Sequence, residues 1–138
     1  MKAQMSVALF VGTLLAAPLV AQDTLVVELN KVEASEGGGC STYFLFRNGT
    51  GLNFATLELS LAILDGNGVI NQLLTVDAAP VPAARTTLKL FDISGLACDD
   101  ISELLVHDIP ACAPEDGTAP ACFETIALES LADVALVK

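Results

Sequence analysis

Apolar and polar residues alternate with a period of two along much of this chain. The clearest example runs from Ala55 to Asp65, where one face carries Leu57, Leu59, Leu61 and Ile63 and the other carries Glu58, Ser60 and Ala62. A strand that buries one face requires this spacing, whereas a helix would repeat every 3.6 residues. The segment is therefore predicted to be a half-buried strand.

A turn signal follows this strand directly. The sequence Asp65-Gly-Asn-Gly68 contains residues that tolerate positive φ, and the segment after it, residues 69–76, is again rich in apolar residues. Two strand-like runs joined by such residues are typical of a β-hairpin.

Further strands are expected on both sides of the hairpin. They are residues 24–32, 42–47, 86–93, 101–109 and 123–128. Turns are expected at residues 36–39 and 48–51. Residues 78–84 contain two prolines, which cannot donate to a central ladder, so this segment is predicted to cross from one sheet to the other. Residues 129–138 fit either a helical stripe or an alternating strand, and we favour a strand.

Short strands with frequent turn signals predict the fold class. We expect an all-β protein, a single immunoglobulin-like β-sandwich of about seven strands. No internal repeat, linker or low-complexity tract divides the chain. Residues 22–138 are therefore expected to form one domain.

The first 21 residues have the order of a secretory signal peptide. Lys2 precedes an apolar run from Met5 to Ala17, Pro18 breaks it, and the small Ala21 stands before Gln22. The alternative, a membrane anchor, would need about 20 apolar residues. No Cys follows the expected cleavage point, as a lipoprotein would need, and no Arg pair marks twin-arginine export. We predict Sec-type export to the periplasm or medium, with cleavage between Ala21 and Gln22.

Export changes how the four cysteines are interpreted. Cys40, Cys98, Cys112 and Cys122 all follow the signal, and none forms a CxxC pair that would favour zinc. An oxidising compartment favours disulfides instead. Three pairings are possible, and we predict Cys40–Cys98 and Cys112–Cys122. On the chain-entropy model these would contribute about 4 and about 3 kcal/mol respectively.

Several of these segments resemble a known family. The runs are Tyr43-Phe-Leu-Phe-Arg-Asn-Gly, Leu57 to Val69 and Pro82 to Phe91. They look like small bacterial β-sandwiches of the FxLYD type, and Gly95-Leu-Ala-Cys-Asp-Asp-Ile is similar to uncharacterised periplasmic proteins of alphaproteobacteria. The resemblance covers about residues 40–110. It implies a sandwich fold and an envelope location, and it brings no catalytic residues.

The charge balance limits the classes of partner. The chain has a formal charge of −11, and loss of Lys2 with the signal leaves five basic residues against 17 acidic ones. Nucleic acids and anionic membrane surfaces are bound through clustered Lys and Arg, so neither is expected as a partner. A basic periplasmic protein is expected instead.

Candidate chemical sites have simpler structural interpretations. Asp65-Gly-Asn-Gly-Val begins like a calcium loop, but Val69 and Val76 stand where further ligands are needed. The adjacent pairs Asp99-Asp100 and Glu115-Asp116 are expected to be solvated turn acids. His107, beside Asp108, lacks a nucleophile motif and is expected at the surface. Asn48-Gly-Thr50 matches a glycosylation sequon but is expected to be a turn.

The sequence thus favours an exported protein that is not an enzyme and needs no cofactor or metal. The preferred function is protein interaction or support of an envelope assembly. The alternative is a module that binds a small ligand or calcium through its acidic loops. The expected partner contact is the loop residues Pro114, Glu115, Asp116 and Gly117, because an exposed loop fixed to a rigid sandwich is a common binding site.

Overall fold

The protein forms two β-sheets in the computed structural model, which describes residues 12, 16, 24–115 and 121–138. The strands are β1 (Leu25–Ala34), β2 (Cys40–Asn48), β3 (Phe54–Asp65), β4 (Ile70–Asp77), β5 (Arg85–Ile93), β6 (Ile101–Pro114), β7 (Ala127–Ser130) and β8 (Ala135–Val137). Short helical turns occur at η1 (Glu36–Gly38), η2 (Cys98–Asp100) and α1 (Cys122–Thr125). None of the described helices is long and apolar enough to cross a membrane.

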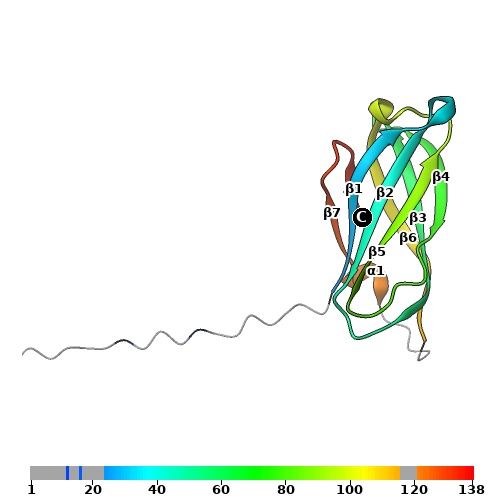
Figure 1. Ribbon diagram of the computed structural model, residues 1–138. Helices are drawn as coiled ribbons and strands as arrows, with labels where there is room; N and C mark the ends of the chain where they lie inside the picture. The colour runs from blue at the N-terminus through cyan, green and yellow to red at the C-terminus, as the bar shows by residue number, and fades with distance from the viewer. Residues whose placement is uncertain (1–11, 13–15, 17–23, 116–120) are drawn as a thin grey trace, which may run out of the picture.

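The strands divide equally between the two sheets. Sheet A has the order β5-β2-β1-β7, and sheet B has the order β4-β3-β6-β8. The sheets face one another as a sandwich, with the edge strands β4 and β5 on the same side (Figure 1). The predicted all-β sandwich is therefore confirmed, with eight strands in place of about seven.

Alternation along the strands explains the core. The predicted inner set of β3, Leu57, Leu59, Leu61 and Ile63, is fully buried. Strand β2 of sheet A alternates in the same way. Its buried residues Phe44 and Phe46 belong to the same hydrophobic core as the inner residues of β3 and β6 in sheet B. Because side chains on a strand point to opposite faces in turn, the other residues of these strands face outward.

The turns and crossings follow the sequence closely. Residues 66–69 close the β3–β4 hairpin, with the Asp65 backbone N–H donating to Val69 O at 2.8 Å. The segment Ala78–Ala84 leads from β4 in sheet B to β5 in sheet A, as its prolines predicted. Val81, in the middle of this segment, is buried and exchanges two backbone hydrogen bonds with Phe54.

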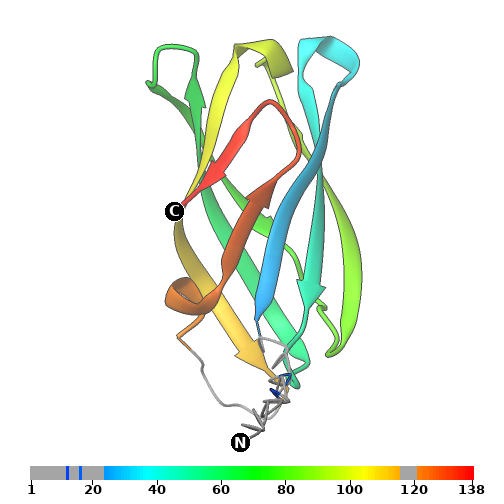
Figure 2. The same ribbon diagram turned by 90° about the vertical axis from the view of Figure 1, so that its left-hand side faces the viewer.

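Two predicted boundaries were wrong. The strand expected over residues 101–109 continues to Pro114, because Cys112 and Pro114 pair with Leu57 and Phe54 of β3. Residues 123–128 were expected to be one strand, but Cys122–Thr125 is helical and β7 begins at Ala127. The chain here leaves Cys122, which is bonded to β6 of sheet B, and reaches β1 of sheet A within a few residues. One helical turn makes this crossing, as Figure 2 shows.

The last residues form strands, as we favoured. β7 pairs in parallel with β1, and β8 pairs in parallel with β6. Together they close the side of the sandwich opposite β4 and β5 (Figure 2). The helical alternative for residues 129–138 is thereby excluded.

Both predicted disulfides are present. Cys40–Cys98 joins the start of β2 in sheet A to η2, which leads into β6 of sheet B. Cys112–Cys122 joins β6 to α1. No free cysteine remains.

Candidate functional site

Charged residues are distributed unequally between the two sheets. The strands of sheet A carry four basic residues, Lys31, Arg47, Arg85 and Lys89, and four acidic ones, Glu28, Glu33, Asp92 and Glu129. The strands of sheet B carry five acidic residues, Glu58, Asp65, Asp77, Glu103 and Asp108, and not one Lys or Arg. The strands of sheet A are therefore balanced in total charge, and the strands of sheet B are acidic.

Two of the basic residues on sheet A contact acidic residues directly, the first of them at Glu28. Glu28 is on the outer face of β1 but is only 3% exposed, and it forms an ion pair with Arg47 of β2. Asn30 donates a second hydrogen bond to Glu28 at 2.8 Å. The Arg47 guanidinium, helped by Asn30, lowers the pKa of the Glu28 carboxyl. The same contact raises the pKa of Arg47.

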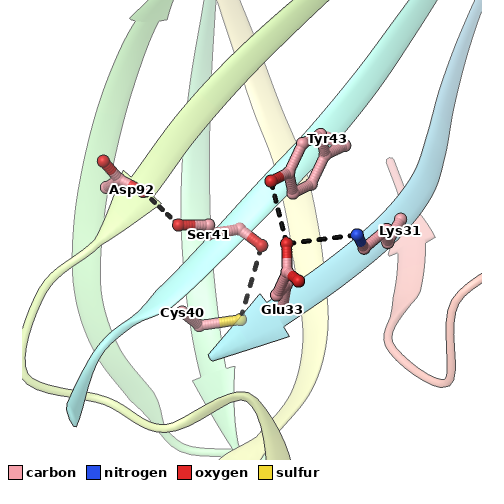
Figure 3. A network of polar contacts seen from close by, with 6 residues as sticks. All are labelled: Lys31, Glu33, Cys40, Ser41, Tyr43 and Asp92. Carbon is pink, nitrogen blue, oxygen red and sulfur yellow. Dashed lines mark hydrogen bonds and ion pairs between the residues drawn. The ribbon is translucent and has the colours of Figure 1, made fainter. Parts of the chain in front are cut away.

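A second network lies further along the same face (Figure 3). Lys31 Nζ lies 3.1 Å from Glu33 Oε2, and the Tyr43 hydroxyl donates to the same oxygen at 2.9 Å. Ser41 on β2 donates to Asp92 on β5 at 2.5 Å. The hydrogen bond from Lys31, followed by that from Tyr43, lowers the pKa of Glu33, and donation to Glu33 raises the pKa of Tyr43.

Two further cations are engaged by main-chain oxygens. Lys89 points toward the interior from the edge strand β5, opposite Phe44, and donates to Ala79 O at 2.9 Å. Lys138 donates to Phe123 O at 2.8 Å and Ile126 O at 2.7 Å. Both ion pairs found within residues 24–115 and 121–138 are on sheet A. The carboxylates of sheet B have no basic side chain to pair with on their own strands.

The outer face of sheet B combines these carboxylates with apolar residues, of which Ile70 and Leu73 are exposed, Leu64, Leu105 and Val137 are partly exposed, and Ala62 is buried. Ladder pairs place Leu73, Ala62, Leu105 and Val137 in one row across the four strands. The adjacent row is Ile70, Leu64, Glu103 and Ala135. Leu73 is 65% exposed and Ile70 56% exposed. We call Ala62, Leu64, Ile70, Leu73, Leu105 and Val137 the outer apolar strip.

The predicted hairpin turn and the Asp99-Asp100 pair meet at one end of sheet B. Asp65, Asp99 and Asp100 line a hollow of about 440 Å³ together with Asn67 and Asn71. One carboxylate oxygen of Asp65 accepts backbone hydrogen bonds from Asn67 at 2.9 Å and Val69 at 3.0 Å, as expected for a turn residue. Within the described ranges no three His, Cys, Asp or Glu side chains are grouped to hold a metal ion.

His107 is exposed on the outer face of sheet B, next to Ser60. Ser60 Oγ and His107 Nε2 are 2.7 Å apart. The carboxylate of the neighbouring Asp108 accepts the backbone N–H of Ile109 at 2.8 Å. The pair lies on an open strand face, whereas a nucleophile–base pair needs a third group to orient the base and donors to stabilise an oxyanion.

The sequon at Asn48 is structural. Asn48 is buried, and its amide donates to the carbonyl oxygens of Leu52, Val81 and Pro82. Its side-chain oxygen accepts from the Thr50 backbone N–H at 3.0 Å, which forms the expected turn. The amide nitrogen is therefore not accessible for modification.

The predicted contact loop is partly described. Pro114 is buried at the end of β6, opposite Phe54, and Glu115 is exposed. The Glu115 backbone N–H donates to Asn53 O at 2.9 Å, which fixes the start of the loop to the end of the sandwich. Asp116 and Gly117 lie outside the described residues. Cys122 belongs to the hydrophobic core, so the disulfide that closes the loop also anchors it.

An apolar cavity opens near this loop. Its volume is about 300 Å³, and its lining includes Leu25, Leu52, Phe54 and Ile126. The hydroxyls of Thr50 and Thr125 also line it, and each already donates within the protein, to Asn48 Oδ1 at 2.6 Å and to Ala121 O at 2.9 Å.

Sequence reasoning identified the acidic excess but not its location. The two segments that supply β3, β4 and β6 of sheet B, residues 54–77 and 96–115, contain no Lys or Arg, and this absence is visible in the sequence. The absence of Lys and Arg describes one face of the molecule only because these segments belong to the same sheet.

Comparison with known proteins indicates the fold. No family model matches the chain, and no curated protein matches it, so the FxLYD-type resemblance stays a prediction. One solved structure that is similar is IrmA from Escherichia coli, with a TM-score of 0.54 and 16% sequence identity. The match covers 80% of this chain and 92% of that one. At this identity, the likeness shows that the two proteins share a β-fold.

Proposed function

We propose that this protein is an exported, non-enzymatic interaction module whose partner is a basic protein. The observation that supports this proposal is the separation of charge between the sheets. On sheet A two acidic residues, Glu33 and Glu28, are paired with Lys31 and Arg47, whereas the strands of sheet B carry five carboxylates and no basic residue. Nothing in the packing of the sandwich requires this asymmetry, because the outer faces contribute no side chains to the core.

A face of one sign has a defined physical effect. It attracts partners of opposite charge, which raises the rate of encounter, and it disfavours partners of the same charge. Salt weakens the effect because the screening length is only about 8 Å at physiological ionic strength. Binding that depends on sheet B should therefore be fast and sensitive to salt.

The direct test is capture of the partner by matched variants. The sheet B variant is Glu58→Gln, Asp77→Asn, Glu103→Gln and Asp108→Asn; the sheet A control is Glu33→Gln, Asp92→Asn and Glu129→Gln. Wild type and the control should recover the same basic protein from a periplasmic extract at 50 mM salt and lose it at 300 mM. The sheet B variant should not recover it. Equal recovery by both variants would overturn the proposal.

The location is part of the proposal. Two disulfides between all four cysteines support export, because such bonds are formed and kept in oxidising compartments. The expected signal peptide, residues 1–21, lies almost wholly outside the described residues. Intact mass of the exported protein tests it: the expected amino terminus is Gln22, and a mature form that keeps Met1 would contradict it.

The strand order also supports an immunoglobulin-like classification.

The loop from Pro114 to Gly117 remains a proposed part of the contact. Glu115 is exposed at the end of β6 and therefore adds a carboxylate to the sheet B side of the molecule. If the loop contributes, Glu115→Gln should weaken partner capture less than the fourfold sheet B variant.

A second candidate function is binding of a small apolar molecule. The cavity lined by Leu25, Leu52 and Phe54 favours it, since ligand pockets commonly begin at about 300 Å³ and are mainly apolar. Titration with the fluorescent probe N-phenylnaphthylamine tests this function. Saturable binding that Leu52→Trp abolishes would support it, and binding unchanged in Leu52→Trp would contradict it.

A further inference from the structure

The outer apolar strip has carboxylates on both sides of it. On one side are Glu103, in the second row of the strip, and the hollow lined by Asp65, Asp99 and Asp100. On the other side Asp108 pairs with Ser60, and beyond it Glu58 pairs with Asp77. Glu58 and Ser60 point outward because their neighbours Leu57, Leu59 and Leu61 are buried, and Asp77 and Asp108 are their partners on the adjacent strands.

The dimensions of this surface are set by the sheet. Four strands spaced about 4.8 Å apart make a strip roughly 14 Å long, and successive outward residues on a strand are about 7 Å apart. An α-helix is about 10–12 Å across. A helix lying along the strip, across the strands, therefore places its two flanks above the carboxylates on either side.

The unmatched charge decides which occupant fits. A second copy of this chain would bring another five sheet B carboxylates against the first five, which like-charge repulsion disfavours. An anionic membrane surface is disfavoured for the same reason. A helix with Leu or Ile on its central face and Lys or Arg on both flanks satisfies the apolar strip and the carboxylates together.

Sheet A offers no equivalent surface. Leu88 and Leu90 of β5 are 60% and 50% exposed and pair with Leu45 and Tyr43 of β2. The basic residues on this outer face, Lys31 and Arg47, already form ion pairs with Glu33 and Glu28. A partner there would have to break internal ion pairs to satisfy its own charges.

We propose that the outer face of sheet B binds a basic amphipathic helix of about three turns, with its apolar face on the outer apolar strip and its basic flanks on the carboxylates. This inference rests on the proposed function and adds the surface and the shape of the partner segment. About three turns, or roughly 10–12 residues, correspond to the length of the strip.

The test uses a synthetic probe and a pair of matched variants. The probe is a 14-residue helical peptide with Leu on one face and Lys on both flanks, and the control peptide has the same composition in scrambled order. Leu73→Ser and Leu88→Ser are the matched variants, since each removes an exposed leucine from an edge strand, one on sheet B and one on sheet A. Binding is measured by fluorescence anisotropy at 50 mM salt.

The expected result is specific to the pattern. Wild type should bind the helical peptide more tightly than the scrambled one. Leu73→Ser should weaken binding about tenfold, because the bound helix would bury the Leu73 side chain. Leu88→Ser should change binding less than twofold. Amide chemical shifts of the wild type should change in β3, β4 and β6, which tests the location without any substitution.

Other outcomes would overturn the inference. If the fourfold sheet B charge variant loses binding but Leu73→Ser does not, the acidic face still recruits a basic partner, and the helix-on-strip geometry is wrong. If neither the fourfold charge variant nor Leu73→Ser weakens binding, the proposed function fails as well. Sedimentation showing a wild-type dimer that Leu73→Ser dissociates would assign the strip to a second copy of this chain and contradict the proposal.

Discussion

Sheets A and B have equivalent inner faces and very different outer faces. Both bury alternate apolar residues in one shared core, which includes Phe44 and Phe46 from sheet A and Leu59 and Leu61 from sheet B. On the outside, sheet A forms two ion pairs, Glu28–Arg47 and Glu33–Lys31, whereas sheet B exposes carboxylates and apolar side chains. Folding therefore places the same requirement on both inner faces and leaves the outer faces free to differ. For this reason we base the proposed function on the outer face of sheet B.

The largest expected effect is on the shared core. Leu59→Asp in sheet B and Val27→Asp in sheet A should both prevent folding, because each buries a carboxylate without a partner at a site that is 1% exposed. We expect a loss of more than about 4 kcal/mol in the free energy of unfolding. Circular dichroism and urea unfolding measure it.

The outward neighbour Ser60 provides the control for this prediction. Ser60→Asp should keep the β spectrum, since the side chain is on the outer face of β3 beside His107. If substitutions at Leu59 and Ser60 proved equally harmful, the assignment of inner and outer faces would be wrong.

The two disulfides should differ in a way that reflects the sheets they join. Cys40–Cys98 connects sheet A to the segment entering sheet B, and its loss through Cys40→Ser with Cys98→Ser should cost about 4 kcal/mol. Cys112–Cys122 closes a shorter loop, and its loss should cost about 3 kcal/mol or less with the β spectrum intact. Urea unfolding of both double variants checks this order, and a larger loss for the shorter loop would reverse it.

The charge network of sheet A should make stability depend on pH. The pKa of Glu28 is lowered in the folded protein, so its contribution is complete above the unfolded-state pKa of about 4.3 and is lost as pH falls through the folded-state pKa. Urea unfolding of wild type and Glu28→Gln between pH 7 and pH 3 should show a smaller acid-dependent loss in the variant. Arg47→Met should reduce the same loss, because Arg47 is the main cause of the lowered pKa. Identical pH profiles for all three proteins would mean that the pair contributes nothing measurable.

The smallest expected effect on stability concerns the free edges. Edge strand β5 of sheet A points Lys89 inward, a device that hinders pairing with another chain. On the edge strand β4 of sheet B, the inward residue opposite Ile63 is the uncharged Gln72. Lys89→Leu should change the free energy of unfolding by about 1 kcal/mol or less but increase concentration-dependent association. Sedimentation velocity measures the association, and Gln72→Leu is the matched control on the other edge. A Lys89→Leu protein that stays as monomeric as wild type would show that the edge is protected in another way.

The sequence by itself determined the local structure of this protein. Alternation of leucines from Leu57 to Ile63 specified a strand and its inner face, because the period of a strand is a property of the backbone. Asp65-Gly-Asn-Gly68 specified the hairpin turn, and the prolines in residues 78–84 specified the crossing. The acidic excess was also evident, although the boundaries at β6 and α1 were missed because pairing with β3 and the anchoring of Cys122 override local preference.

Only the tertiary structure decided which strands lie together. β3 and β6 are far apart in the sequence but adjacent in sheet B, whereas Arg47 and Glu28 come from separate segments that meet in sheet A. The candidate surface depends on this assembly, since Leu73, Ala62 and Leu105 form a row only through ladder pairing between strands. Such contacts follow from burying one continuous core between two sheets, and no local pattern in the chain encodes the order in which the strands are placed.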